Sequence, residues 1–236
     1  MFKSKAASVK ASGNSVGETT KEQILEHALE LFRKRGFEMT TMRDIARAAK
    51  VATGAAYYYF PSKEAIVSGY YDQVQLLLAE RVREQLGGKE GLRERLGIVM
   101  HSKLEILKDD RMFLGALFRY TGEPGHPLSV FGKGTQPQSK QSMTIFREAL
   151  EGANVSGDLK QLLAWVMWLA HLGMILFFIY DESEGQAKTH KLVDGGLDLL
   201  AGLVEFMSSP LVQPFVKPFQ EKVLGILREA GWAEEI

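Results

Sequence analysis

Cysteine is absent from this chain of 236 residues. Its absence excludes disulfide bonds, thiolate metal sites and cysteine nucleophiles. An excess of charge of either sign is also missing, because 29 Lys and Arg balance 29 Asp and Glu. Apolar residues make up 45 % of the chain and charged residues 25 %, which is ordinary for a globular protein. The length allows one large domain or two small ones.

The balanced total conceals an asymmetry of charge along the chain. Residues 1–63 carry 11 Lys and Arg against 6 Asp and Glu, a formal charge of +5, and residues 64–236 carry 18 against 23, or −5. A basic first part followed by an acidic remainder indicates that only the first part meets a polyanion such as nucleic acid. Composition alone leaves a chance asymmetry open as the alternative.

Residues 1–18 have few bulky side chains and no apolar run. They therefore predict a disordered tail and not a signal peptide, and we expect a cytoplasmic protein. Three lysines of the tail are candidates for non-specific contact with a DNA backbone. A formal G-x-S-x-G match at residues 13–17 lacks the strand and helix that a nucleophile elbow requires.

Residues 39–64 contain the most specific local pattern. Thr41 and Asp44 have the spacing of a capping box, and the apolar residues that follow recur with a helical period. A second short helix is expected over residues 54–59, with Thr53 as its N-cap. Two short helices joined by a tight turn form a helix-turn-helix, whose second helix is narrow enough to enter a major groove.

The same stretch matches a family signature close to T-x-x-x-I-A-x-x-A-G-V-x-x-G-x-x-Y-x-x-F-x-x-K-E. The matching residues are Thr41, Ile45, Ala46, Ala49, Val51, Gly54, Tyr57, Phe60, Lys63 and Glu64. Over roughly residues 20–75 the chain therefore resembles the TetR/AcrR regulators. Two positions depart from the pattern: Lys50 stands where the family usually has Gly in a left-handed turn, and Tyr59 stands where His is common.

The second short helix has few side chains that read bases. Residues 53–59 contain no Arg, Asn or Gln. The hydroxyl groups and cations that are present favour contacts with phosphate. Recognition of a particular DNA sequence is therefore expected to depend on Arg43, Lys50, close backbone approach at Gly54, or DNA shape. The expected DNA-binding residues are Thr40, Thr41, Arg43, Lys50, Thr53, Gly54, Ala55, Tyr57, Tyr58, Tyr59 and Lys63.

No alternation typical of strands persists anywhere, so the sequence predicts an all-α fold. The resemblance implies a three-helix DNA-binding head, which we place at 19–79, and a helical body at 80–236 that binds an effector and dimerises. Residues 122–140 are rich in Gly and Pro and predict a long break without regular structure. The helices expected after the helix-turn-helix span 62–86, 90–108, 112–120, 142–150, 159–181, 187–208 and a last amphipathic segment before 232.

Residues 162–180 have His171 as their only titratable group apart from the closing Tyr180, and they are long enough to cross a membrane. Acidic residues follow closely and no second span is evident, so we expect a buried helix. Together with 187–208 it is the expected dimer interface, because two such helical hairpins make a four-helix bundle.

The resemblance also implies a small-molecule effector, whose pocket would need apolar walls and a few polar groups. Plain core packing is the alternative for the same side chains. We expect no metal, because the histidines lack paired carboxylates at ligand spacing, no cofactor, and no catalytic residue. The candidate pocket residues are Met100, His101, Leu104, Phe113, Phe118, Trp165, Trp168 and His171.

These observations predict a sequence-specific transcriptional regulator and not an enzyme. The expected form is a homodimeric repressor that a small apolar effector releases from a double-stranded DNA operator. The alternatives are a helical regulator that responds to a protein or to a membrane, and an enzyme with a helical body. The enzyme would require a catalytic constellation, and the sequence contains none that we recognise.

Overall fold

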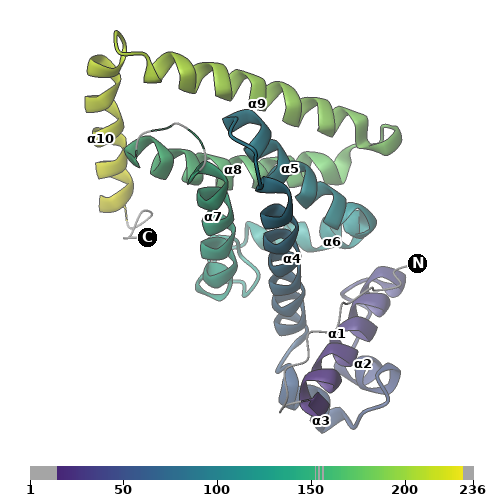
Figure 1. Cartoon of the computed structure of the whole chain (residues 1–236). Coiled ribbons are helices and arrows are strands. Elements are labelled where there is room, and N and C mark those ends of the chain that lie inside the picture. Colours follow the sequence, from purple (N-terminus) through teal and green to yellow (C-terminus); the bar gives the residue numbers. More distant parts are fainter. Residues whose placement is uncertain (1–14, 152, 154, 156, 231–236) are drawn as a thin grey trace. The chain divides into compact units, whose positions relative to one another are not determined.

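The computed structural model describes residues 15–151, 153, 155 and 157–230 (Figure 1). Within these ranges the chain forms ten α-helices and three short 3-10 helices, and no strand. The all-α prediction is confirmed. Backbone contacts divide the chain into two units, the first ending at Ile66 and the second beginning at Val67. The division falls inside one long helix, α4, which spans Lys63–Leu86.

The first unit is built from α1 (Ser15–Arg35), α2 (Met42–Ala48), α3 (Thr53–Tyr59) and the start of α4. α1 ends before Gly36, whose φ of +87° suits a residue without a side chain. The three helices pack through their apolar sides, which removes those side chains from water. The most deeply buried members of this core are Ile24, Ala28, Phe32, Phe37, Ile45, Ala46, Ala56, Phe60 and Ile66.

Two details of the first unit differ from expectation. α1 begins at Ser15, inside the stretch 1–18 expected to be a disordered tail, and most of that tail lies outside the described residues. Thr53 is the first residue of α3, and Ala52 is its N-cap without a side-chain hydrogen bond. The helix begins without that cap because the Ala52 carbonyl already accepts hydrogen bonds from the amides of Ala55 and Ala56.

The second unit contains the remaining helices, and α8 is the helix around which they are arranged. α7, α6, α9 and α10 all pack against α8, and Figure 1 shows α9 running beside it. The helices are α5 (Leu92–Leu107), α6 (Arg111–Thr121), α7 (Gln136–Glu151), α8 (Gly157–Tyr180), α9 (Ala187–Ser208) and α10 (Gln213–Glu229), with 3-10 turns at Lys108–Asp110, Lys133–Thr135 and Glu184–Gln186.

The expected break at 122–140 is shorter in the structure. A 3-10 turn at Lys133–Thr135 leads directly into α7, which begins at Gln136 and not at 142. Pro137 did not prevent this, because it occupies the first turn of α7, where a helix needs no backbone N–H from it. The Thr135 hydroxyl also donates to the Ser129 carbonyl and fixes the turn before the helix.

The connection between α8 and α9 is held by two side chains. The Asp181 carboxylate accepts hydrogen bonds from the amide and hydroxyl of Thr189 at 2.8 and 2.7 Å. Burial opposes ionisation of Asp181, but the hydrogen bonds from Ser183 and Thr189 outweigh it and lower the pKa of the carboxyl. Arg111 of α6 donates to the carbonyls of Phe178 and Ile179 at 2.9 and 3.1 Å. These contacts fix the C-terminus of α8.

α8 has the length and composition of a membrane span over Leu159–Tyr180, but it packs inside the second unit. In the single chain, 39 % of the most apolar stretch of α8 is buried. Leu163, Met167, Met174 and Phe178 are buried among the neighbouring helices. The expectation of a buried helix is thus met on one side of α8, while its other side leaves apolar residues exposed.

Candidate nucleic-acid interface and internal cavity

α3 presents one side to the interior and the other to solvent. Ala56 is fully buried, whereas Tyr57 is 49 % and Tyr58 82 % exposed. Thr53 and Gly54 at the start of the helix are exposed as well, and a side chain added at Gly54 would meet nothing within 4 Å. The exposed side of α3 therefore offers hydroxyl groups and an open backbone surface, which suit contact with a nucleic-acid backbone.

The predicted capping box at the start of α2 is present. The Thr41 hydroxyl accepts a hydrogen bond from the Asp44 amide at 3.2 Å, and the Asp44 carboxylate accepts one from the Thr41 amide at 3.1 Å. The Thr41 hydroxyl also donates to that carboxylate at 2.6 Å. These bonds hold the pKa of Asp44 below its usual value. The Thr41 side chain is thus engaged in fixing α2.

Two other expected DNA-binding residues also make internal contacts. Thr40 is 1 % exposed, and its hydroxyl donates to the Gly36 carbonyl at 2.9 Å. The Lys63 ammonium donates to the carbonyls of Phe37 and Glu38 at 2.7 and 3.4 Å and lies 4.5 Å from the centre of the Phe37 ring. In this structure Thr40 closes the α1–α2 connection on itself, and Lys63 of α4 holds that connection from outside.

The turn between α2 and α3 places a cation at the surface. Lys50 adopts a φ of 56°, the left-handed conformation expected at this position, and its side chain is exposed. Arg43 and Arg47 lie four residues apart on α2 and are both exposed, and Arg47 pairs weakly with Asp44 at 3.6 Å. Arg47 was not among the predicted residues; its spacing from Arg43 on one helix was the available signal.

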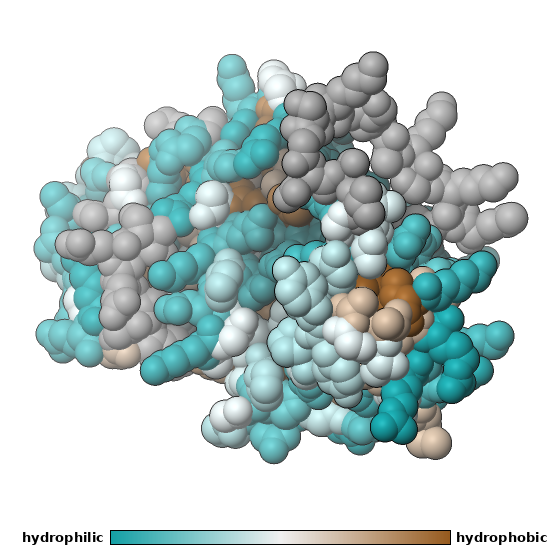
Figure 2. All heavy atoms as spheres, turned by 90° about the horizontal axis from the view of Figure 1, so that it is seen from below, coloured by the Kyte–Doolittle hydropathy of each residue, from teal (hydrophilic) through white to brown (hydrophobic). Residues whose placement is uncertain are grey.

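The surface seen in Figure 2, on the side where α3 lies in Figure 1, is mainly hydrophilic in colour and has only small apolar patches. Such a surface suits a polar, charged partner better than an apolar one. The exposed candidates of α2, α3 and the turn between them share a donor group or an open backbone. They are Arg43, Arg47, Lys50, Thr53, Gly54, Tyr57 and Tyr58, with Ala55 and Tyr59 partly exposed.

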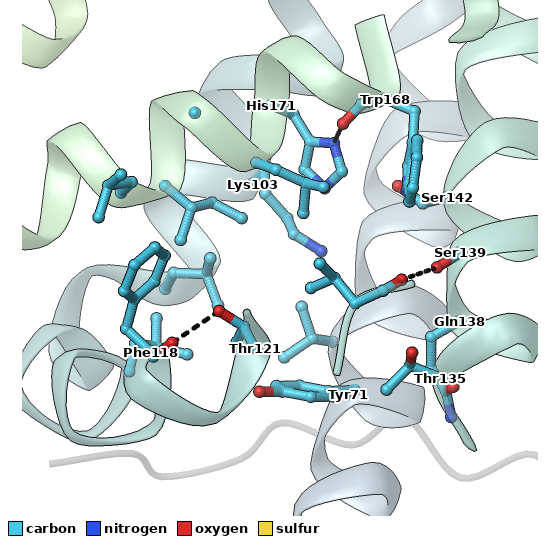
Figure 3. Close-up of a pocket in the computed structure, with 18 of the residues that line it drawn as sticks. Tyr71, Lys103, Phe118, Thr121, Thr135, Gln138, Ser139, Ser142, Trp168 and His171 are labelled. Atoms are coloured by element: carbon cyan, nitrogen blue, oxygen red, sulfur yellow. Dashed lines mark hydrogen bonds between the residues drawn. The ribbon is translucent and has the colours of Figure 1, made fainter. Parts of the chain in front are cut away.

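The second unit contains a partly open cavity of about 410 Å³ whose accessible wall is predominantly apolar. It is lined by α4, α5, α6, α7, α8 and the segment before α7. Of the predicted pocket residues, Phe118, Trp168 and His171 line this cavity (Figure 3). Met100, Leu104 and Phe113 are instead buried in the core, and Trp165 lines a separate hollow beside Leu224 and Leu227 of α10.

His101 belongs to a different cluster, between α5 and α9. Its Nδ1 lies 3.0 Å from Nδ1 of His190, and its Nε2 lies 3.0 Å from Asp194. The hydrogen bond from His101, and after it the hydrogen bond from Arg93, hold the pKa of Asp194 below its usual value although burial opposes the shift. Among the residues described, no group of three His, Cys, Asp or Glu side chains has the arrangement of a metal site.

The polar part of the cavity wall consists of neutral hydroxyl and amide groups and a few ionisable ones; the neutral groups include those of Thr121, Thr135, Gln138, Ser139 and Ser142. The Lys103 ammonium lies 3.5 Å from Oε1 of Gln75, and burial lowers the pKa of Lys103 to about 8. Nδ1 of His171 is hydrogen-bonded to the Trp168 carbonyl. Burial and the positive charge of Lys103 together lower the pKa of His171 to about 3, so the imidazole is neutral. Burial likewise raises the pKa of Tyr71.

Lys103 and Gln75 were missing from the predicted pocket. Lys103 occupies the same side of α5 as Met100 and Leu107, at a spacing of three and four residues, which is the buried side of that helix. A lysine within an apolar helical stripe was therefore the signal that could have identified this position.

Comparison with known proteins gives a consistent result. Residues 24–69 match the model of bacterial regulatory proteins of the tetR family, and residues 95–217 match the tetracyclin repressor-like C-terminal domain. The HTH-type transcriptional regulator YuxN of Bacillus subtilis (strain 168) is 33 % identical over 228 residues, which cover 85 % of this chain and 77 % of YuxN.

Two solved structures share the fold. The TetR transcriptional regulator of Nitrosomonas europaea ATCC 19718 aligns with a TM-score of 0.63 at 18 % identity, over 77 % of this chain and 97 % of that one. Thermus thermophilus FadR, described as a TetR family repressor in complex with lauroyl-CoA, aligns with a TM-score of 0.53 at 24 % identity, over 75 % and 92 %. The chain therefore belongs to the tetR family of bacterial regulatory proteins and is a DNA-binding transcriptional regulator, not an enzyme.

Proposed function

We propose that the protein is a homodimeric repressor that leaves its DNA operator when a small apolar effector enters the cavity of the second unit. The observation that carries this proposal is the apolar cavity of about 410 Å³ within a chain that also has a helix-turn-helix. In this proposal residues 19–79 bind DNA, residues 80–236 bind the effector and dimerise, and the protein acts in the cytoplasm, where its operator lies.

For DNA contact, the proposal gives different roles to two groups of residues. Arg43, Lys50, Thr53, Tyr57 and Tyr58 have exposed side chains and contact the phosphates or the groove directly. Thr40, Thr41 and Lys63 act through the fold, because their polar groups already have partners within the first unit. Gly54 and Ala55 contribute the close approach of the backbone at the start of α3.

For dimerisation, support comes from the apolar side chains that one chain leaves uncovered on α8 and α9. Such a row exceeds the scattered apolar residues of an ordinary surface and marks an interaction site. Pairing two copies through these helices would bury the row in a four-helix bundle. The exposed residues are Val166, Phe177 and Tyr180 on α8 and Leu192, Leu199, Leu203 and Phe206 on α9.

For the effector, support comes from the volume and lining of the cavity. Pockets for small molecules usually enclose about 300–1,000 Å³ and combine apolar walls with a few polar groups, and this cavity fits that range. The structure of Thermus thermophilus FadR was solved in complex with lauroyl-CoA, so a protein of the same fold accepts a ligand with an acyl chain.

The proposal is tested by selecting DNA from a random library with the full-length protein at fixed salt. A dimer should enrich two inverted half-sites about one helical turn apart, and the complex should contain two protein chains. Replacing Leu199 of α9, which is 79 % exposed, by Asp should give a monomer and weaken binding to the selected DNA. Met112→Asp is the matched control, since Met112 is 88 % exposed on α6, outside the proposed interface. A single unpaired half-site bound by one chain would contradict the dimer.

A further inference from the structure

The cavity contains a buried cation without an anionic partner. Lys103 is 6 % exposed, and its ammonium has one hydrogen-bond acceptor, Oε1 of Gln75, at the long distance of 3.5 Å. No carboxylate among the described residues forms an ion pair with it. The two acids nearby in the fold have other partners, because Asp110 accepts from the Tyr70 hydroxyl at 2.8 Å and Asp72 from the Gln138 amide at 2.7 Å.

Burying an unpaired charge is costly, so a protein normally pairs it or removes it. Figure 3 shows the Lys103 side chain extending into the space between α8 and Tyr71. Of the other titratable groups of the wall, His171 and Tyr71 are neutral at pH 7, and the Tyr70 hydroxyl donates a hydrogen bond to Asp110. The cavity wall therefore carries a single positive charge, which matches one negative charge on a ligand. A phosphate dianion would bring a second negative charge without a partner.

The rest of the wall determines what the anion is attached to. Leu114 and Phe118 of α6 and Leu172, Leu176 and Ile179 of α8 surround the cavity with aliphatic and aromatic carbon. At about 30 Å³ per non-hydrogen atom, the share of volume of a liquid water molecule, a cavity of about 410 Å³ holds roughly 14 such atoms. That content corresponds to a fatty carboxylate of about ten to twelve carbons in all.

From this geometry we propose that the cavity binds an amphipathic carboxylate, with its alkyl chain along α6 and α8 and its carboxylate on the Lys103 ammonium. This inference rests on the proposed function, because it names the class of the effector. Gln75 keeps its place beside the bound carboxylate as the group that orients the ammonium, since its amide is itself held by the Gln138 carbonyl at 3.3 Å.

The test compares ligands of equal chain length. The full-length protein is titrated at pH 7 with decanoate and with decan-1-ol, and binding is followed by fluorescence, since Trp168 lines the cavity. A hydrogen bond to a charged group predicts that decanoate binds about 10- to 100-fold more tightly than the alcohol. In Lys103→Met this preference should disappear. In Lys140→Met, which changes an exposed lysine on α7, it should remain.

A second measurement on the unchanged protein covers the case in which the Lys103 variant does not fold. Between pH 7 and pH 9 the affinity for decanoate should fall roughly tenfold as Lys103 loses its proton, and the affinity for decan-1-ol should not change. Three other titratable groups among the described residues face the cavity: Tyr71 on α4 and His171 on α8 stay neutral over this range, and the Tyr70 hydroxyl on α4 donates to Asp110. The inference is overturned if the alcohol binds as tightly as decanoate, or if Lys103→Met keeps the preference.

The same samples separate this inference from the proposed function. If decanoate binds through Lys103 but leaves the affinity for the selected DNA unchanged, the ligand class stands and release by that ligand fails. If decan-1-ol binds as tightly as decanoate and both release DNA, release by an effector stands and the assignment of a carboxylate is overturned.

Discussion

Replacing Lys103 by Met is expected to stabilise the protein when its cavity is empty. Methionine has a similar length and shape but no charge, so it fills the same space beside Leu107 and His171. Replacing even a buried ion pair by apolar side chains of similar volume is often neutral or stabilising by about 1–4 kcal/mol, and Lys103 is buried with no ion pair among the described residues. The exchange also removes the weak hydrogen bond to Gln75.

The expected size follows from the pKa of Lys103, which burial lowers from 10.5 to about 8. A shift of that size corresponds to about 3 kcal/mol by which folding disfavours the charged amine. Between these two pKa values the unfolded chain binds more protons than the folded one, so the free energy of unfolding rises with pH. The destabilisation by Lys103 is therefore complete below pH 8 and declines as the pH rises towards 10.5. The stabilisation by Lys103→Met should therefore be about 3 kcal/mol at pH 7 and about 1 kcal/mol at pH 10.

Urea unfolding of both proteins at pH 7 and pH 10, followed by tryptophan fluorescence, measures this difference. Trp165 and Trp168 of α8 report on the second unit, which contains the cavity. Lys140→Met is the control, because a substitution of an exposed lysine should change stability by less than about 0.5 kcal/mol. A destabilised Lys103→Met variant, or a stabilisation of equal size at both pH values, would refute the reasoning that Lys103 is a buried, unpaired cation.

Three further predictions concern the first unit. Lys50→Gly should stabilise α2 and α3 by about 1 kcal/mol, because glycine adopts the φ of 56° without strain. Hydrogen exchange of the α2 and α3 amides should then be slower, and an unchanged exchange rate would show that the turn is not strained. Lys63→Met should destabilise the same amides by about 1–2 kcal/mol, since it removes the hydrogen bond to the Phe37 carbonyl, and unchanged exchange would contradict that role. Tyr58→Phe should weaken binding to all DNA sequences alike without changing exchange, as a lost phosphate contact does, and a loss confined to one sequence would indicate base reading instead.

Local signals predicted most of the helices. The capping box of Thr41 and Asp44 fixed the start of α2, and α9 has the expected bounds, Ala187–Ser208. The start of α7 was predicted too late, because proline in the first turn of a helix gives the same local signal as proline in a loop. Helical periodicity thus identifies the elements well, whereas their ends depend on turns that the periodicity does not describe.

The candidate sites were less predictable than the helices. Whether Lys63 contacts a phosphate or the Phe37 carbonyl depends on where the α1–α2 connection lies in space. The residues near Lys63 in the sequence do not predict that position. The same limit applies to α5, where His101 and Lys103 both stand near apolar neighbours. Tertiary packing turned Lys103 to the cavity and His101 to Asp194 of α9.

Arg111 stands at the first position of α6 and holds the last carbonyls of α8, while Leu114 and Phe118 further along α6 form part of the cavity wall. A ligand that displaces α6 must therefore break these contacts or carry the end of α8 with it. The same end of α8 exposes Phe177 and Tyr180. We therefore expect occupancy of the cavity to alter this exposed apolar surface, through the Arg111 hydrogen bonds and the direct packing of α6 on α8. In the proposed dimer, a ligand bound within one copy would then change how the two copies pack.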